Sequence, residues 1–467
     1  MWNSLVIFRI VTCPSVRSAL RDLSDASPRG LGYLKPWEQQ NMGSLNLEES
    51  LPVDRKRRLS SVLGFGRVQR RPEIDALRGV FLVWMTLAHL PTHLSDLVNE
   101  PFGFVSSAEG FVFLSALLVA RLYIRQATEA GAALRTKLWK RALRIYGYHL
   151  ILLACAFSIA AAFAVMAHRL ALINLLNFYL AHPFPAIVGS LLLIYCPPLL
   201  DILPMYVIFL LITPFLLAIA AHRGWKGILL ASGSVWLFAQ FGLRAWVHDV
   251  VVHVTTLQIP LQDTGSFNLF AWQMVWVSGL CIGATSAQEG RSFRRPPRFV
   301  YQVSALICIF FIGVRRNWFG NHLTQQTLGI QLDKWQIGPL RLVNLIAFAC
   351  VIYGSRKLLM RLFLTEPFIM LGKASLQVFC AHLAFVFVGL ALLYGTVSEL
   401  HGFDAVGLVV LTFAGLIFVA LRKIRRERQE QTTNNQELKT DPPPHMHLGL
   451  TGDDQEKKDL MAPMRAL

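Results

Sequence analysis

Long apolar segments separated by short polar or basic connections follow one another along residues 72–425 of the 467-residue chain. An α-helix needs about 20 apolar residues to cross the roughly 30 Å hydrocarbon core of a bilayer. Ten segments have about this length: 76–96, 104–124, 146–167, 203–221, 226–246, 266–286, 297–314, 337–354, 374–396 and 404–421. The pattern therefore predicts an all-α integral membrane protein with about ten transmembrane helices.

Two shorter apolar stretches, at 170–181 and 184–196, differ from these spans because they are too brief or are broken by proline. We interpret both as interfacial or re-entrant segments. Flanking the membrane domain, residues 1–71 are polar and end in basic runs, and residues 426–467 are charged. Both flanks are predicted to be disordered, and the second to form a cytoplasmic tail.

The net charge of +17 would suit a nucleic-acid partner, so its placement along the chain matters. With the N-terminus inside, about 28 Lys and Arg residues fall in the cytoplasmic connections and about four on the opposite side. This asymmetry is the positive-inside pattern of membrane proteins. It predicts that both termini are cytoplasmic and that the basic charge orients the chain in a lipid bilayer rather than binding nucleic acid.

The most informative polar residues are Arg78 and His89, which lie inside the first apolar segment. Eleven helical residues make almost three turns, so both side chains project from one face, about 16 Å apart along the axis. Ionisable residues inside a span are costly and usually mark a site. Imidazole titrates near neutral pH, so His89 is a candidate for proton transfer, with a hydrogen-bonding role as the alternative.

Asp75 and His93 flank this pair and are candidate substrate-binding residues. His93 lies one turn beyond His89 on the expected helix face. For Asp75, which is three positions before Arg78, the alternative is a local ion pair at a capped helix end.

The second apolar segment contains Glu109, a carboxylate that must be neutralised or paired in such surroundings. Glu109 could orient His89 as a catalytic carboxylate does, or it could pair with a structural arginine. Before the third segment, Arg141 and Arg144 are three positions apart on one helix face. They could hold an anionic donor as a guanidinium fork, or they could simply anchor the helix at the membrane surface.

Asp201 lies between prolines before the fourth span, where irregular backbone is tolerated only if it lines a cavity. It could bind a polar acceptor or cap the helix that follows. Ser375, Gln377 and His382 begin the ninth span, and we expect them to make hydrogen bonds between helices. The seven cysteines occur singly without metal-ligand spacing, so no metal site is predicted.

Together these motifs resemble the OpgC-type branch of the acyltransferase-three superfamily over about residues 72–425. The resemblance is carried by Asp75-x-x-Arg78-Gly79, Arg78-x10-His89, the block from Ala108 to Ser115, Asp201-Ile-Leu-Pro-Met-Tyr206 and the block from Ala374 to His382. The chain departs from the pattern at Ala116, where the second-span block usually continues with glycine. In the superfamily the functional elements are the Arg-x10-His pair and an Arg-x-x-Arg, here Arg78, His89, Arg141 and Arg144.

The resemblance implies a bacterial inner-membrane O-acyltransferase. The acyl donor would be a cytoplasmic acyl-CoA that acts as co-substrate, with no tightly bound cofactor. The named activity of the branch is succinylation of osmoregulated periplasmic glucans, so the acceptor would be a hydroxyl of a periplasmic or envelope glycan. The competing interpretation is a transporter or flippase for a glycan or an anionic solute, in which the same buried charges line a path.

Overall fold

The computed structural model describes residues 71–440 apart from 130, 288–295, 321–322 and 396. The described residues form helices and contain no strand beyond an isolated bridge between Thr92 and Leu400. In chain order the helices begin with α5 (Pro72–His89), α6 (Leu94–Val98), α7 (Ser107–Glu129), α8 (Gly131–Cys155) and α9 (Ala161–Met166), and α13 (Ile202–Arg223) follows after three short helices. The remaining long helices are α14 (Lys226–Gln240), α15 (Leu243–Thr255), α16 (Leu269–Ala287), α17 (Arg298–Arg315), α19 (Pro339–Gly354), α20 (Arg356–Phe363), α21 (Glu366–Lys373), α22 (Ser375–Leu392) and α23 (Gly402–Thr440).

The predicted all-α membrane architecture is confirmed, but the helices are less uniform than ten straight spans. Among the described residues, seven helices are long and apolar enough to cross a membrane, or up to nine if each of two bent pairs is one span. The segment predicted at 226–246 bends by 82° between α14 and α15, where Gly242 has a left-handed backbone. The segment predicted at 337–354 corresponds to α19, and the chain bends by 74° directly after it, between α19 and α20. The side on which each terminus lies stays a prediction.

The two short apolar stretches form only short helices, as expected from their length and prolines: α10 (Leu170–Leu175), α11 (Asn177–Ala181) and α12 (Pro183–Leu191). The prediction of a disordered tail from residue 426 is wrong as far as 440, because α23 continues through this charged sequence. An ion pair between Lys423 and Glu427, one turn apart, supports the extension. The segment 1–70 and residues 441–467 lie outside the described residues.

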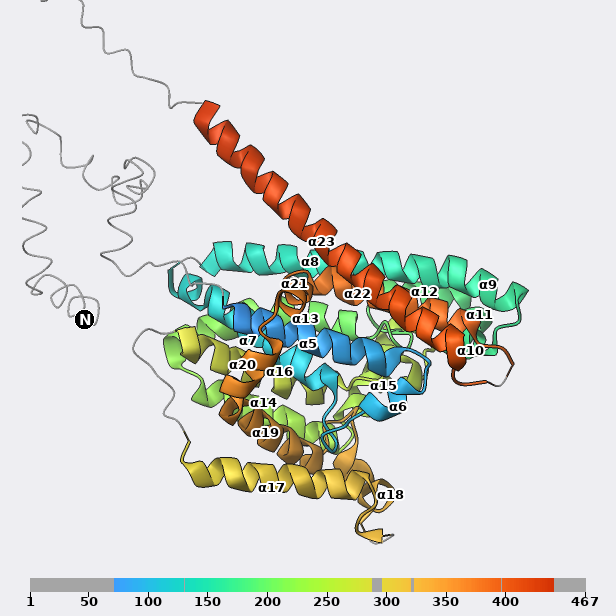
Figure 1. Cartoon of the computed structure of the whole chain (residues 1–467), viewed down its shortest axis with the longest axis horizontal. Helices are drawn as coiled ribbons and strands as arrows, with labels where there is room; N and C mark the ends of the chain where they lie inside the picture. The colour runs from blue at the N-terminus through green and yellow to red at the C-terminus, as the bar shows by residue number, and fades with distance from the viewer. Residues whose placement is uncertain (1–70, 130, 288–295, 321–322, 396, 441–467) are drawn as a thin grey trace, which may run out of the picture. The chain divides into compact units, whose positions relative to one another are not determined.

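Small residues let the central helices approach closely (Figure 1). α7 packs against α16 through Gly279 and Gly283, where a Cβ would collide with the backbone carbonyls of Phe113 and Leu117. The spacing of these glycines is the small-xxx-small motif of tightly packed membrane helices. In the view of Figure 1, α5 and α7 lie between α8 on one side and α17 on the other. α5 and α7, which carry Asp75, Arg78, His89 and Glu109, belong to this closely packed part of the bundle.

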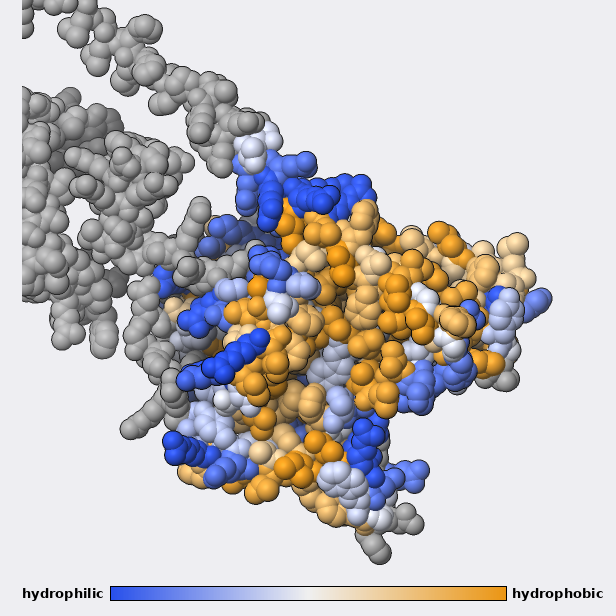
Figure 2. Space-filling view, in the orientation of Figure 1, coloured by the Kyte–Doolittle hydropathy of each residue, from blue (hydrophilic) through white to orange (hydrophobic). Residues whose placement is uncertain are grey.

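Large apolar side chains cover much of the face that Figure 2 shows, with hydrophilic residues gathered toward its edges. Exposed examples come from helices on several sides, such as Ile159, Phe241, Leu306, Val388 and Phe418. Soluble proteins rarely expose so many contiguous apolar residues. The surface is therefore the one expected of a multi-pass membrane protein.

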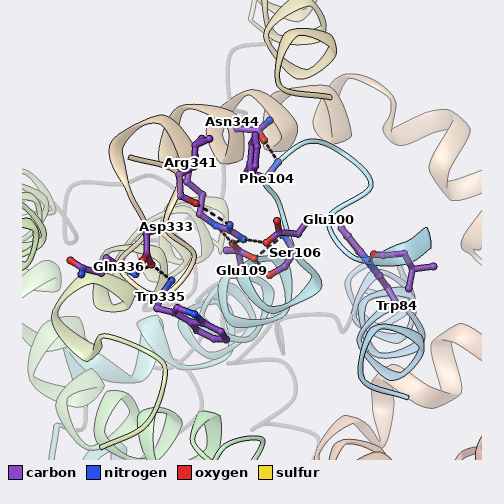
Figure 3. Close-up of polar contacts among 12 residues, drawn as sticks. Trp84, Glu100, Phe104, Ser106, Glu109, Asp333, Trp335, Gln336, Arg341 and Asn344 are labelled. Carbon is purple, nitrogen blue, oxygen red and sulfur yellow. Dashed lines mark hydrogen bonds and ion pairs between the residues drawn. The ribbon is translucent and has the colours of Figure 1, made fainter. Parts of the chain in front are cut away.

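A buried ion-pair network fixes the segment that joins α6 to α7 (Figure 3). Arg341 of α19 donates to Glu109 of α7 at 2.8 Å and to Glu100 at 2.7 Å, and all three residues are almost fully buried. Asn344, one turn further along α19, accepts a hydrogen bond from the Phe104 backbone N–H at 2.7 Å. One face of α19 therefore holds both ends of the segment that precedes α7.

We expect Arg341→Met to lower the free energy of unfolding by about 3–5 kcal/mol, because it leaves two carboxylates buried without their cation. Thermal melting of the purified protein in detergent, followed by size-exclusion chromatography, measures the loss. The triple variant Arg341→Met, Glu100→Gln, Glu109→Gln removes all three charges and is expected to recover part of it. A melting temperature of Arg341→Met equal to that of the wild type would show that the network contributes nothing to stability.

Candidate functional site

Helix α5 carries both Arg78 and His89, and its C-terminal end decides where the histidine lies. The helix ends at His89 because Leu90 is extended and precedes Pro91, and a proline disfavours helical backbone in the residue before it. The prediction of one helical segment over 76–96 is therefore wrong beyond His89. His89 is the last residue of α5, where the helix opens onto a loop.

His93 does not share the helix face of His89, as the sequence suggested, because α5 has already ended. Its side chain is 73% exposed, and its Nδ1 lies 3.9 Å from Oε2 of Glu399. His93 does not line the cavity that contains His89. The structure therefore gives no support to the predicted contact between His93 and a substrate.

Arg78 lines a cavity of about 70 Å³ together with Arg141 of α8; we call it the arginine cavity. The Arg78 guanidinium donates a hydrogen bond to the Ser375 hydroxyl of α22 and lies 5.7 Å from the centre of the Phe111 ring. The resemblance named Arg78 and Arg141 as functional residues, and the fold brings them to one cavity. The contact with Ser375 is one of the predicted hydrogen bonds between helices.

Arg144 differs from Arg141 although both belong to α8. Arg141 is half-buried and lines the arginine cavity, whereas Arg144 is exposed and does not line it. The two guanidinium groups therefore do not face one cavity as a fork. A contact between Arg144 and an anionic donor stays a prediction for the surface of the protein.

Two buried hydroxyls complete the polar lining of the arginine cavity. They belong to Ser115 of α7 and Tyr206 of α13, and neither makes a hydrogen bond of good geometry within the described part of the chain. The surrounding side chains, such as Leu210 and Trp276, are apolar. A cavity with guanidinium and hydroxyl donors in apolar surroundings suits a negatively charged group.

His89 forms a pair with His382 of α22. Nδ1 of His89 lies 3.2 Å from Nε2 of His382, and the two rings stack with their centroids 5.5 Å apart. Nδ1 of His382 lies 2.6 Å from the backbone carbonyl oxygen of Phe379. This confirms that His382 makes a hydrogen bond between helices, and its partner is the candidate catalytic residue.

The chain of contacts determines where the protons of the two neutral rings reside. A carbonyl oxygen only accepts, so Nδ1 of His382 must donate to Phe379. Nε2 of His382 then accepts, and Nδ1 of His89 must donate to it. Nε2 of His89 therefore keeps its lone pair and is the nitrogen that can take up a proton.

The surroundings of His89 form a second cavity of about 340 Å³, which we call the histidine cavity. Asp201, which precedes α13, lines it together with Ser107 at the start of α7. Lys334 and Trp335, from the segment before α19, line it as well. Sequence reasoning assigned Asp201 to substrate binding, and the fold brings it to the same cavity as His89.

Asp201 is buried, and it accepts a hydrogen bond from the Ser266 backbone N–H at 2.8 Å. Burial raises the pKa of Asp201 from 3.8 to about 6, although the hydrogen bonds from Ser266 and the charge of Lys334 act in the opposite direction. A carboxyl group in this state can accept or donate a hydrogen bond near neutral pH.

Glu109 does not contact His89, whose ring partner is His382. Its carboxylate accepts hydrogen bonds from Arg341 and, at 3.0 Å, from the Ser106 backbone N–H. Ser106 and Glu109 have the spacing of a capping box at the first turn of α7. Of the two roles that the sequence left open for Glu109, the structure supports the pairing with an arginine rather than the orientation of His89.

Asp75 is buried where α5 crosses α21, and its backbone carbonyl faces Gly372. It lines neither the arginine cavity nor the histidine cavity. The structure thus places Asp75 at a helix contact, and its predicted contact with a substrate stays a prediction.

Phe379 and Ile202 line both cavities and form the boundary between them. The Phe379 ring packs on Phe111 on one side and on His382 on the other, with centroid distances of 6.1 Å and 4.9 Å. The sequence did not identify Phe379 as a site residue, because the sequence pattern of an apolar span does not show which of its aromatic residues line a cavity. Lys334 was also missed, since it was counted only as a charge outside the membrane.

We expect the stability of the protein to depend on pH through Asp201. Because its folded-state pKa lies above the ordinary value of 3.8, the folded protein holds this proton more tightly than the unfolded chain does. The protonated Asp201 carboxyl therefore adds to the free energy of unfolding at low pH, and this contribution is lost as the pH rises through about 6. Lowering the pH from about 7.5 to 5 should therefore stabilise the wild type by about 1 kcal/mol relative to Asp201→Asn. Melting temperatures of both proteins across this range measure the difference, and parallel profiles would contradict the prediction.

The comparison with known protein families gives a match that covers most of the chain. A family model described as OpgC protein matches residues 70–428, which include every element that forms the two cavities. Searches of curated proteins and of solved structures give no match.

Proposed function

The chain belongs to the OpgC family, and from this premise and the arrangement of the two cavities we propose that it is a membrane O-acyltransferase. In this proposal it transfers an acyl group from a cytoplasmic acyl-CoA to a hydroxyl of a periplasmic or envelope glycan. The arginine cavity binds the donor side, and the histidine cavity binds the acceptor. Kinship with the wider acyltransferase-three superfamily and location in the bacterial inner membrane are part of the same proposal.

The observation that carries the proposal is the free lone pair on Nε2 of His89. The contact between Nδ1 and His382 holds the ring in one tautomer and one orientation, as the third member of a catalytic triad does for its histidine. The histidine cavity leaves room for a hydroxyl beside this base. General bases are positioned in this way when they activate a hydroxyl nucleophile.

In the proposed reaction, Nε2 of His89 takes the proton of the acceptor hydroxyl as its oxygen attacks the thioester carbonyl carbon. The carbonyl oxygen of the resulting tetrahedral intermediate carries a negative charge. Collapse of the intermediate breaks the carbon–sulfur bond, and the leaving thiolate takes the proton from His89. The products are an O-acyl ester and free CoA, and the imidazole returns to its starting state.

The start of α7 offers a means to stabilise that negative charge. Ser107 and Ala108 belong to its first turn and line the histidine cavity beside His89. The first N–H groups of a helix have no partner within the helix, and its N-terminus carries a partial positive charge. Glu109 holds this turn in place through Ser106 and Arg341, so in this proposal it supports the site from outside the reaction.

Arg78 and Arg141 supply the donor side. CoA carries several phosphate charges, and guanidinium groups bind phosphate through charge-assisted hydrogen bonds. The thioester at the end of the pantetheine arm would then reach His89 across the boundary that Phe379 and Ile202 form. One helix, α5, thereby presents a donor contact and the base at different depths.

We expect His89→Ala to lower the rate of acyl transfer at least 100-fold, because general base catalysis contributes about 10² to 10⁴ in rate. His382→Ala should cost less, since it releases the orientation of His89 and leaves the base in place. The assay incubates the purified protein with acyl-CoA and a glucan oligosaccharide and measures free thiol and acylated sugar.

His93→Ala is the matched control, because His93 is exposed outside both cavities. It should retain the wild-type rate. Wild-type acyl transfer by His89→Ala would overturn the proposed base. Passage of labelled, unmodified glucan across sealed vesicles, without thiol release, would favour the transporter interpretation instead.

We expect Arg141→Ala to raise the KM for acyl-CoA by about tenfold or more, since a charge-assisted hydrogen bond contributes about 1.5–3 kcal/mol. The measurement compares Arg141→Ala with Arg144→Ala, whose side chain does not line the arginine cavity. The effect of Arg144→Ala should be smaller.

An acyl-pantetheine thioester, which lacks the phosphates, provides the control for this interpretation. With that donor the difference between Arg141→Ala and the wild type should disappear. An unchanged KM of Arg141→Ala for acyl-CoA would show that the arginine cavity does not bind the donor.

A further inference from the structure

A third cavity of about 350 Å³ adjoins the histidine cavity; we call it the side cavity. The two cavities share four lining residues, which are Asn99, Glu100, Lys334 and Trp335. Each is within the size range of small-molecule sites, which begins at about 300 Å³. The side cavity is therefore the immediate neighbour of the histidine cavity.

The side cavity combines an aromatic surface with hydrogen-bonding groups of several kinds. The Trp335 ring is about two-fifths exposed. Asn99, Asp333 and Lys334 supply an amide, a carboxylate and an ammonium group to the same lining. A sugar ring has a C–H face that packs on an indole and a rim of hydroxyls that both donate and accept, so this lining matches its chemistry.

The backbone of Trp335 is held rigidly, so the indole would be in place before a ligand binds. Its N–H donates to the Asp333 carboxylate at 2.6 Å, and its carbonyl accepts from the Asn268 N–H at 3.0 Å and from the Trp272 indole at 3.1 Å. The ring packs edge to face against Phe267, at a centroid distance of 5.4 Å. A preorganised aromatic contact binds with little loss of conformational freedom.

The Lys334 ammonium is available for hydroxyls. It lies 5.0 Å from the centre of the Trp335 ring, and it makes no ion pair or hydrogen bond with the described residues. Of the two carboxylates in this lining, Glu100 is paired with Arg341, and Asp333 accepts from the backbone N–H groups of Trp335 and Gln336. Lys334 can therefore donate to a ligand beside the Trp335 ring without breaking a hydrogen bond or an ion pair to the described residues.

We propose that the side cavity is a second sugar subsite, which binds the sugar unit next to the one that is acylated beside His89. Trp335 provides the stacking surface, and Lys334 and Asn99 hydrogen-bond the hydroxyls. The inference rests on the proposed function for the reaction in the histidine cavity and names the acceptor more closely. The enzyme is selective for acceptors of two or more sugar units over single sugars.

The test measures acyl transfer to glucose and to gluco-oligosaccharides of two to five units, in β-1,2, β-1,3 and β-1,4 linkage. In the wild type, kcat/KM should rise at least tenfold from glucose to the best disaccharide. Trp335→Ala should abolish that increase, and Trp335→Phe should keep part of it. Trp246→Ala is the matched control, because Trp246 is an exposed tryptophan that lines neither cavity, and it should keep the full increase.

The ratio of kcat/KM for the disaccharide to kcat/KM for glucose decides the proposal. A general loss of activity lowers both values and leaves this ratio unchanged. An equal ratio in Trp335→Ala and the wild type, or no dependence on acceptor length in the wild type, would overturn it. Calorimetric titration of the His89→Ala protein with the same oligosaccharides, without donor, separates the two inferences. Trp335-dependent binding together with no acyl transfer by the wild type would contradict the proposed function and leave the subsite standing.

Discussion

The ion pairs that Arg341 makes with Glu100 and Glu109 are the constraint on which the arrangement of α19, α7 and the segment between α6 and α7 depends. Three charges buried away from water are stable only as a closed set, since removing one leaves its partners uncompensated. To close the set, the segment before α7 must lie against α19. That segment and the first turn of α7 supply one wall of the histidine cavity. The shape of the candidate site thus follows from an electrostatic requirement outside it.

A second constraint is the end of α5 at His89. A helix that continued past Pro91 would have carried the imidazole along its side, packed among neighbouring helices. Because the helix stops, the His89 ring lies at its end. Nδ1 makes a hydrogen bond to His382, and Nε2 keeps its lone pair. The same break sends the chain through the bridge between Thr92 and Leu400 and takes His93 away to the surface. One proline therefore separates two histidines that the sequence pattern had placed together.

The sequence could predict those features of the fold and of the site that depend on residues close together in the chain. Apolar length located the helices, because every span must bury its own backbone hydrogen bonds. Local spacing also held the capping box of Ser106 and Glu109 and the close-packing motif of Gly279 and Gly283, although neither was used. The partners of His89 and Glu109 lie 293 and 232 positions away. No spacing in a single sequence indicates such pairs, so the role of Glu109 could only be left open.

The separation of the two cavities gives the proposed reaction its direction. In the proposed reaction the charged donor lies beside Arg78 and Arg141, whereas the histidine cavity and the side cavity present aromatic and mixed polar groups suited to a neutral, hydroxyl-rich acceptor. Neither substrate needs to enter the cavity of the other if the thioester alone crosses at Phe379 and Ile202. A bilayer enzyme that joins substrates from opposite sides has to keep the barrier closed while the reacting atoms meet. In the proposed reaction that barrier is the boundary of Phe379 and Ile202, whose apolar side chains are unfavourable surroundings for an ion.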